Sequence, residues 1–295
     1  MNTPKRILFV GDLHTGGHHS VLPRKRLPEF PEFPGIRYLN DCWDNAVFNL
    51  PEMVDITFFM GDLVEGTNRK AEGTGLFSTK LSDQVESAIE LLAPIAARSK
   101  TVFRVKGTDY HDSVHNPLLA LDIELGVRKA RQVFDVDLGS GILNVAHHPS
   151  GGGALYLGTK LDKEQRLAGL AALAKKVPHA RWIFRAHLHN FAHFITPMRE
   201  VILTPCWKLP DAYSVKGNYF GWQPDIGMVL MEEDERSLSG FRVVPILYDL
   251  PQPRVITQEE LDGTMIDYVD VFDKPLEGFV ELPEESEEGG TGDED

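Results

Sequence analysis

Five short apolar runs recur along the first two thirds of the chain, and each ends at a polar or titratable residue. They occupy residues 6–12, 54–62, 101–107, 141–147 and 181–187. Apolar runs of this length are typical of fully buried β-strands. Between them, apolar residues at three- and four-residue steps predict helices over 81–97, 118–131 and 161–177. Pro94 is expected to break or kink the end of the first of these helices.

The order of these elements indicates the fold class. Strands that alternate with helices predict an α/β protein with mostly parallel pairing. After residue 190 the pattern changes, because four strand-like segments follow in close succession at 191–196, 199–204, 226–232 and 240–249. Such short connections favour antiparallel pairing.

Two long loops follow the first two predicted strands. Residues 15–40 contain four prolines and the basic cluster Arg24, Lys25 and Arg26, and residues 65–80 are rich in Gly, Thr and charge. Both loops follow strand ends, so both are expected at one edge of the sheet, and long loops in compact domains are often functional. No linker separates two folding units, which predicts one domain over residues 1–280.

The acidic charge is concentrated at the C-terminus. The 295-residue chain has 30 Lys and Arg against 44 Asp and Glu, but residues 281–295 hold eight acidic residues and no basic one. That segment has no apolar face and is predicted to be a disordered, acidic tail. Of the net charge of −14, residues 1–280 then carry −6, which weighs against tight binding of long duplex DNA by the whole surface.

The composition also excludes several protein classes. A hydrophobic content of 42% excludes disorder of the whole chain, and two cysteines, Cys42 and Cys206, exclude a disulfide scaffold. The N-terminal apolar run Ile7–Val10 is too short for a signal peptide or a membrane span. We therefore expect a cytoplasmic protein with reduced cysteines and no membrane partner.

Carboxylates and imidazoles follow the predicted strands. The residues at the strand ends are Asp12 and His14, Asp62, the segment 107–112, His147 and His148, and His187 and His189. In an open α/β sheet ligands bind outside the carboxyl ends of the strands. In extended chain, residues two apart point the same way, so Asp12 with His14, and His187 with His189, can aim into one pocket.

Mixed imidazole and carboxylate ligands suit first-row transition metals rather than Ca²⁺. Six or seven such side chains exceed the needs of one ion, whereas two ions sharing a carboxylate would use them all. Two-metal sites activate water for displacement at phosphorus. The pattern therefore predicts two divalent transition-metal ions, with Mn²⁺ preferred and Fe, Zn, Ni or Co as alternatives.

Five motifs, in this order, resemble those of the calcineurin-like metallophosphoesterases. They are Gly11-Asp12-Leu13-His14, Gly61-Asp62, Gly107 to Asp112, His147-His148-Pro149 and Ala186-His187-Leu188-His189. The resemblance spans residues 7–190 and implies a four-layer αββα sandwich, in which two mixed β-sheets are flanked by helices. The later strands are expected to complete this two-sheet sandwich.

The resemblance implies a role for each motif residue. Asp12, His14 and His189 would bind the first metal, Asp62 would bridge both, and His147 and His187 would bind the second. His147 is preferred to His148 because a His-x-Pro sequence after a strand matches the family form, which leaves His148 at the substrate rim.

The third motif departs from the family pattern. The family supplies an Asn ligand followed by a catalytic His, whereas here the run is Gly107-Thr108-Asp109-Tyr110-His111-Asp112. Thr108 stands at the Asn position, and Asp109 is the expected replacement ligand. His111 would then act as the catalytic acid, with the Asp112 carboxylate orienting its imidazole. Alternatively, His111 is itself a metal ligand.

The resemblance implies a hydrolase that acts on phosphate esters through a metal-activated hydroxide. We expect a phosphodiester substrate, nucleic acid or nucleotide, because several basic residues could line the same rim. They are Arg24, Lys25 and Arg26, together with Lys5, Arg6, Arg69 and Lys70. The alternatives are a phosphomonoesterase acting on protein or a small molecule, and a non-catalytic metal-binding interaction module.

Overall fold

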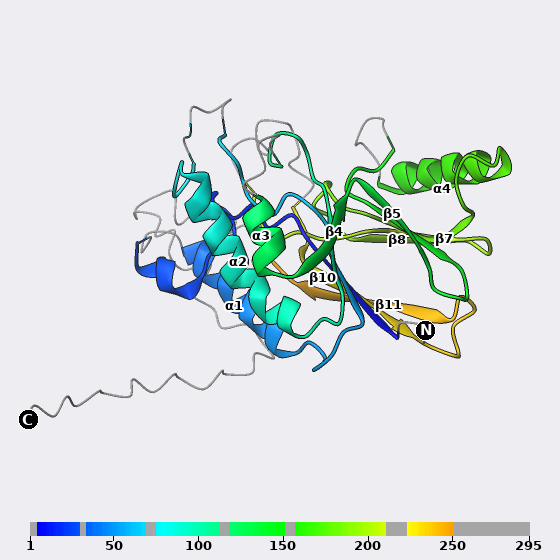
Figure 1. Cartoon of the computed structure of the whole chain (residues 1–295), viewed down its shortest axis with the longest axis horizontal. Helices are drawn as coiled ribbons and strands as arrows, with labels where there is room; N and C mark the ends of the chain where they lie inside the picture. The colour runs from blue at the N-terminus through cyan, green and yellow to red at the C-terminus, as the bar shows by residue number, and fades with distance from the viewer. Residues whose placement is uncertain are drawn as a thin grey trace, which may run out of the picture.

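Two mixed β-sheets lie face to face, and helices cover their outer faces (Figure 1). This computed structural model describes residues 5–29, 34–68, 73, 75–112, 118–150, 157–210 and 223–250. The predicted acidic tail, residues 281–295, lies outside the described residues. No helix in the described segments is both long and apolar enough to cross a lipid bilayer.

The first sheet has six strands in the order β11-β10-β1-β2-β3-β4. Their bounds are β1 Arg6–Val10, β2 Ile56–Phe59, β3 Val102–Val105, β4 Val127–Arg131, β10 Ile226–Glu233 and β11 Phe241–Tyr248. Strands β1 to β4 are parallel, with Ile7 opposite Ile56 and Val10 opposite Phe59 at the β1–β2 pair. Strands β10 and β11 extend the sheet in antiparallel pairing.

The second sheet has five strands in the order β5-β6-β7-β9-β8. Their bounds are β5 Val133–Asp137, β6 Ile142–Ala146, β7 Ala180–Arg185, β8 Ala192–Ile195 and β9 Glu200–Leu203. Strands β6, β7 and β9 are parallel, while β5 and β8 are antiparallel edge strands. The expected antiparallel pairing after residue 190 is confirmed for β8 with β9 and for β10 with β11.

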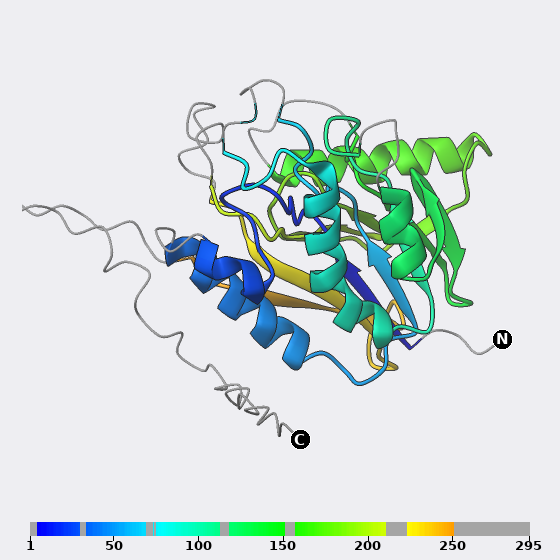
Figure 2. The same ribbon diagram turned by 60° about the vertical axis from the view of Figure 1, so that its left-hand side comes forward.

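Helices α1 (Pro34–Phe48), α2 (Leu81–Ala97) and α3 (Leu118–Glu124) lie on one side of the molecule, and α4 (Leu157–Leu173) lies on the other (Figure 2). Figure 2 also shows the short 3₁₀ helix η1 (Arg24–Glu29) before α1. Apolar residues of α1, α2 and α3 pack on the six-stranded sheet, and Leu161 of α4 packs on β7 and β9. The predicted four-layer αββα sandwich is confirmed.

The alternation of side chains along β1 shows how the layers are joined. Leu8 and Val10 face the helices, whereas Ile7 and Phe9 face the second sheet, so both faces of the strand are buried. This explains why β1 is a continuous apolar run rather than an alternating one. Between the sheets, the rings of Phe9 and Phe184 stack with their centroids 3.7 Å apart.

The predicted helix over 118–131 is wrong in its second half. The helix ends at Glu124, and residues Val127–Arg131 form β4 beside β3. Gly126 lies between them with a φ of 62°, a conformation that favours glycine and ends a helix readily. The helix predicted over 161–177 instead spans Leu157–Leu173.

Helix α1 and strand β5 were also not predicted, and one predicted break does not occur. Helix α1 begins at Pro34, inside the segment 15–40 that the prolines indicated as loop; proline is well tolerated in the first helical turn, where its missing N–H has no helical partner. Strand β5 was also missed. Pro94 lies within α2 without ending it, and its exposed position lets water reach the carbonyl that lacks a donor.

Candidate metal centre

The strand ends of both sheets bring the predicted ligands together. β1 and β2 supply Asp12, His14 and Asp62, whereas β6 and β7 supply His147, His187 and His189. Potential ligand atoms form four groups of three residues, and within each group these atoms lie within 4.8 Å of one another. The first group is Asp12, His14 and His189, and the second is Asp12, Asp62 and His147. The third is His147, His148 and His187, and the fourth is His14, Glu65 and His111. The groups share members, so they form one continuous cluster.

The backbone at this cluster is strained. Seven non-glycine residues in the described segments have a positive φ, and five of them are predicted ligands: Asp12 at 48°, His14 at 51°, Asp62 at 48°, His187 at 72° and His189 at 58°. This left-handed conformation costs roughly 1–2 kcal/mol per residue. Such strain concentrates at ligand clamps and active sites, where surrounding contacts maintain it. Here the amide of Asp12 donates to Gly61 O, and that of His187 donates to Asp12 Oδ2.

The first group surrounds one oxygen of Asp12. Oδ1 of Asp12 lies 3.8 Å from His14 Nε2 and 3.6 Å from His189 Nε2. His14 donates Nδ1–H to Glu65 Oε2 at 2.9 Å, so Nε2, which lies 3.1 Å from His189 Nε2, is the atom that would bind a metal. Burial, aided by Lys208, lowers the pKa of His14 well below its usual value. The imidazole is therefore neutral at pH 7, as a ligand must be.

The second group places an imidazole against a carboxylate. His147 donates Nδ1–H to Met60 O at 2.7 Å, so its other nitrogen, Nε2, lies 3.1 Å from Asp62 Oδ2 without a proton in the neutral form. Burial opposes protonation, but the carboxylates of Asp12 and Asp62 outweigh it and raise the pKa of His147 to about 9. His147 in turn holds the pKa of Asp62 below its usual range, against the effect of burial. The cluster therefore favours positive charge at this point.

Two buried atoms at the centre lack a hydrogen-bond partner. They are Asp12 Oδ1 and His147 Nε2, which has no hydrogen-bond geometry toward Asp62 despite its proximity. A buried polar atom without a partner is costly unless a bound group satisfies it. Both atoms belong to groups with metal-ligand spacing, so the residues fit divalent cations of the transition series.

The third motif contacts the cluster through Thr108 and His111. The backbone N–H and hydroxyl of Thr108 donate to Asp62 Oδ1 at 2.7 and 3.1 Å. The side chain of Asp109 is exposed and belongs to none of the four groups, although its charge reaches His148. Asp109 as a metal ligand and His148 as a substrate contact stay predictions.

The expected orientation of His111 by Asp112 is corrected. His111 donates Nδ1–H to the backbone oxygen of Glu65 at 2.6 Å. Asp112 instead accepts from the Gly107 amide at 2.6 Å and pairs with the buried Arg104 at 3.1 Å. Asp112 thus fixes the loop after β3, because its donor Gly107 lies on that loop and its donor Arg104 lies on β3 itself.

Two buried charged residues were missed by the sequence analysis. Glu65 follows the second motif and accepts from His14, and Lys208 lies after β9 with its Nζ 3.2 Å from Glu65 Oε2. Glu65 stands three residues after Asp62, a spacing that could have marked it as a partner of the site. Lys208 had no such signal, because 143 residues separate it from Glu65.

The basic cluster is engaged by acidic residues on the helices. Arg24 donates to Asp41 and Asp44 of α1, each at 2.6 Å. Lys25 pairs with Glu90 of α2. Substrate contact by Arg24, Lys25 and Arg26 stays a prediction.

Lys5 and Arg6 do not lie on the rim of the site, contrary to our expectation, and Arg69 and Lys70 lie outside the described residues. Lys5 and Arg6 stand at the start of β1, whereas Asp12 follows its end, and they pair with Glu233 and Glu232.

No protein-family model and no curated protein matches the sequence. Among solved structures, the chain is similar to Vps29 of Entamoeba histolytica complexed with Zn²⁺, at 11% identity over 82% of this chain and 99% of that one, with a TM-score of 0.42. It is similar to Vacuolar Protein Sorting 29 of Cryptosporidium parvum, at 14% identity over 84% and 99%, with a TM-score of 0.43. It is also similar to an archaeal phosphodiesterase, at 11% identity over 81% and 99%, with a TM-score of 0.38.

The fold brings the five sequence motifs to one edge of the two sheets. All five motifs follow parallel strands of two facing sheets and supply ligand atoms to one cluster, the third motif through His111. The chain thus resembles the calcineurin-like metallophosphoesterases in its sequence motifs, in its two-sheet architecture and in the convergence of the motif residues at one edge.

Proposed function

We propose that this chain is a dinuclear metal-dependent phosphoesterase that hydrolyses a phosphodiester of nucleic acid or a nucleotide. The observation that carries the proposal is the pair of buried atoms without partners, Asp12 Oδ1 and His147 Nε2, within a cluster of imidazoles and carboxylates. A cluster that raises the pKa of one histidine to about 9 attracts cations.

The residues divide into two ligand sets. Asp12, His14 and His189 would hold one ion, His147 and His187 the other, and Asp62 lies within the group that joins them. When bound, two divalent ions lower the pKa of water and neutralise charge on the phosphoryl oxygens. The imidazole and carboxylate donors suit Mn²⁺, Fe or Zn²⁺, and Mn²⁺ is the ion we propose to test first.

The hydrogen bond and the surroundings of His111 support a role in proton transfer. Its Nδ1–H is held by the Glu65 carbonyl, so Nε2 is the atom that exchanges a proton with substrate. Water adds to phosphorus and releases one proton to solvent, the bond from phosphorus to the leaving oxygen breaks, and His111 in its imidazolium form gives that oxygen the Nε2 proton. The neutral imidazole then regains a proton from solvent. The ring lies edge-on to His14, with centroids 4.5 Å apart, which places it beside the first ligand set.

Tyr110 supports an ester of a nucleoside over one of a small alcohol. Its ring is 37% exposed and lies 4.9 Å from that of His111, centroid to centroid, while its hydroxyl donates to Asn68. An anchored, exposed aromatic ring beside the proton donor offers a stacking surface for a base. A phosphomonoesterase is the competing enzyme.

Hydrolysis of a small substrate panel tests the proposal. The metal-free protein is reconstituted with Mn²⁺, Fe²⁺ or Zn²⁺ and assayed on bis-p-nitrophenyl phosphate, p-nitrophenyl phosphate, and single-stranded and duplex DNA. We expect metal-dependent cleavage of the diester and loss of that activity in His111→Ala. Tyr110→Leu should raise KM for DNA more than for the synthetic diester. Hydrolysis of the monoester alone would overturn the diester assignment.

The altered third motif favours a second candidate, a non-catalytic metal-binding module. Elemental analysis separates the two, because the enzyme should hold about two equivalents of metal and cleave the panel. Binding of metal without hydrolysis of any substrate would favour the module.

A further inference from the structure

The third motif leaves the second ion without the ligand that an Asn would supply. Thr108 stands at that position, but its hydroxyl and its backbone N–H both donate to Asp62. The exposed Asp109 joins no group with His147 or His187. His111 belongs to the group of His14 and Glu65, at the other ligand set. No residue of this motif therefore shares a group with His147 and His187.

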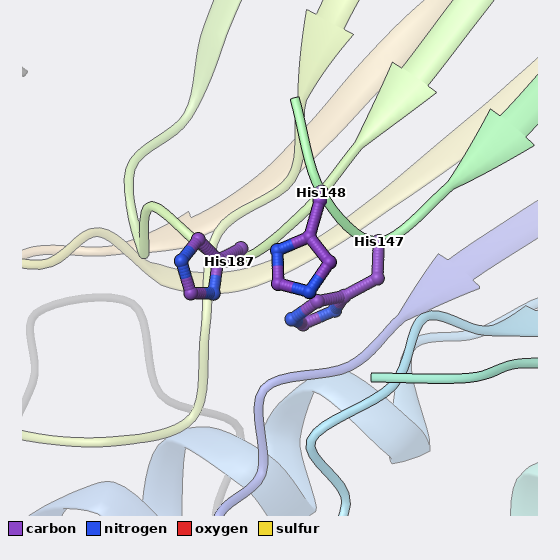
Figure 3. Close-up of side chains that lie close together, drawn as sticks. All are labelled: His147, His148 and His187. Atoms are coloured by element: carbon purple, nitrogen blue, oxygen red, sulfur yellow. The ribbon is translucent and has the colours of Figure 1, made fainter. Parts of the chain in front are cut away.

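His148 lies beside both histidines of that set. Its ring centroid lies 4.6 Å from that of His187 and 4.8 Å from that of His147. One nitrogen from each of the three rings falls within 4.8 Å of the other two. Figure 3 shows the three rings converging, with His148 between the other two.

The backbone explains how two successive side chains face one point. In a strand they would point to opposite faces. Here β6 ends at Ala146, and the chain bends at His147 and His148. The bend is held from α4, because the buried Glu164 carboxylate accepts the Ser150 amide at 2.6 Å and the Arg185 Nε–H at 2.8 Å.

We propose that His148 is a metal ligand that takes the place of the missing amide, so that three imidazoles and the Asp62 carboxylate hold the second ion. This inference rests on the proposed function, since it presumes two metal ions. Exchanging an amide oxygen for an imidazole nitrogen makes the donor set softer. The second ion should therefore be Zn²⁺, Co²⁺ or Ni²⁺ in preference to Mn²⁺, while the first set is unaffected.

Metal titration of the full chain tests this assignment. The metal-free wild type, His148→Ala and His179→Ala are titrated with Zn²⁺ and Mn²⁺ by calorimetry. His179 is the matched control, since it is an exposed histidine at the start of β7, the end of the strand opposite to His187. We expect His148→Ala to bind the first equivalent normally and the second about 100-fold more weakly or worse, because losing a ligand exceeds the 10–100-fold cost of losing an outer-shell partner. Co²⁺ spectra of the doubly loaded forms should differ between wild type and His148→Ala.

The outcomes separate this proposal from the proposed function. Two tight equivalents in both wild type and His148→Ala would overturn the role of His148 and leave the dinuclear enzyme intact. A raised KM in His148→Ala with unchanged metal affinities would likewise overturn it in favour of a substrate contact. Fewer than two equivalents in the wild type would overturn the proposed function itself.

Discussion

Replacement of Gly107 by alanine should displace the carboxylate shared by the two ligand sets. A Cβ built on Gly107 would lie 2.1 Å from Asp62 Oδ1 and 2.4 Å from the Asp62 backbone nitrogen, whereas real Cβ contacts below 3.0 Å are essentially never seen. Asp62 must therefore move by about 1 Å, and the backbone contact prevents relief by side-chain rotation alone. Thr108 resists the shift as well, because its amide is hydrogen-bonded to Oδ1.

The consequences of Gly107→Ala can be given as magnitudes. Overpacking of this kind costs about 1–3 kcal/mol of stability, and a misplacement of about 1 Å in a catalytic group costs about 100-fold in rate. Affinity for both metal equivalents should fall, since Asp62 is proposed to bind both ions. The control is Gly158→Ala in α4, where a Cβ has nothing within 4 Å and the change should be neutral or stabilising. Wild-type metal affinity and activity in Gly107→Ala, measured by calorimetry and diester hydrolysis, would refute the reasoning.

Four other perturbations follow from the structure. Asp62→Asn should lower kcat by about 100-fold or more and weaken both metals; full turnover at low metal content would contradict the scheme. A chelator should lower the melting temperature, since ligand at 100 times its Kd stabilises by about 2.7 kcal/mol; an unchanged temperature would argue against tight metal binding. Glu164→Ala should lower the free energy of unfolding, measured in urea, by about 3–5 kcal/mol, because the Arg185 guanidinium stays buried without the Glu164 carboxylate that pairs with it. A decrease below about 1 kcal/mol would refute this. Hydrogen bonds from Lys100 and two backbone amides lower the pKa of Asp55, against the effect of burial. The stability advantage of wild type over Asp55→Asn should therefore be full above about pH 4 and should vanish as the pH falls through the lowered pKa. A difference in stability that does not depend on pH would contradict this assignment.

The parts of the fold that could be predicted are those encoded by local pattern. Strands β1 and β2 are buried on both faces, so each appears as an almost continuous apolar run, and the polar residue after it marks the strand end. Strands β3, β6 and β7 are mostly apolar, although Arg104, Asn144 and Arg181 interrupt them. Helix α1 could not be found in this way, because Pro34 is compatible both with a loop and with the first turn of a helix. Strand β5 was missed because its edge position leaves Val133 and Asp135 exposed.

The site was predictable to the extent that its residues lie in short motifs. Asp12 and His14 are two positions apart, so the sequence alone indicates that they act together. Glu65 and Lys208 contact each other only because β2 and β9 end near the same place, which no local spacing encodes. Asp112 shows the reverse error: its position next to His111 suggested a pair, but the buried guanidinium of Arg104 is the stronger partner.

The ligands come from both sheets, and this gives bound metal a mechanical role. Asp12, His14 and Asp62 belong to the six-stranded sheet, while the four clustered histidines from His147 to His189 belong to the five-stranded sheet. Ions held between them would cross-link the two layers at one edge, in addition to the apolar contacts such as Phe9 on Phe184. Metal loading should then slow sliding of one layer over the other, and amide hydrogen exchange at the ends of β1, β2, β6 and β7 should slow together as a unit.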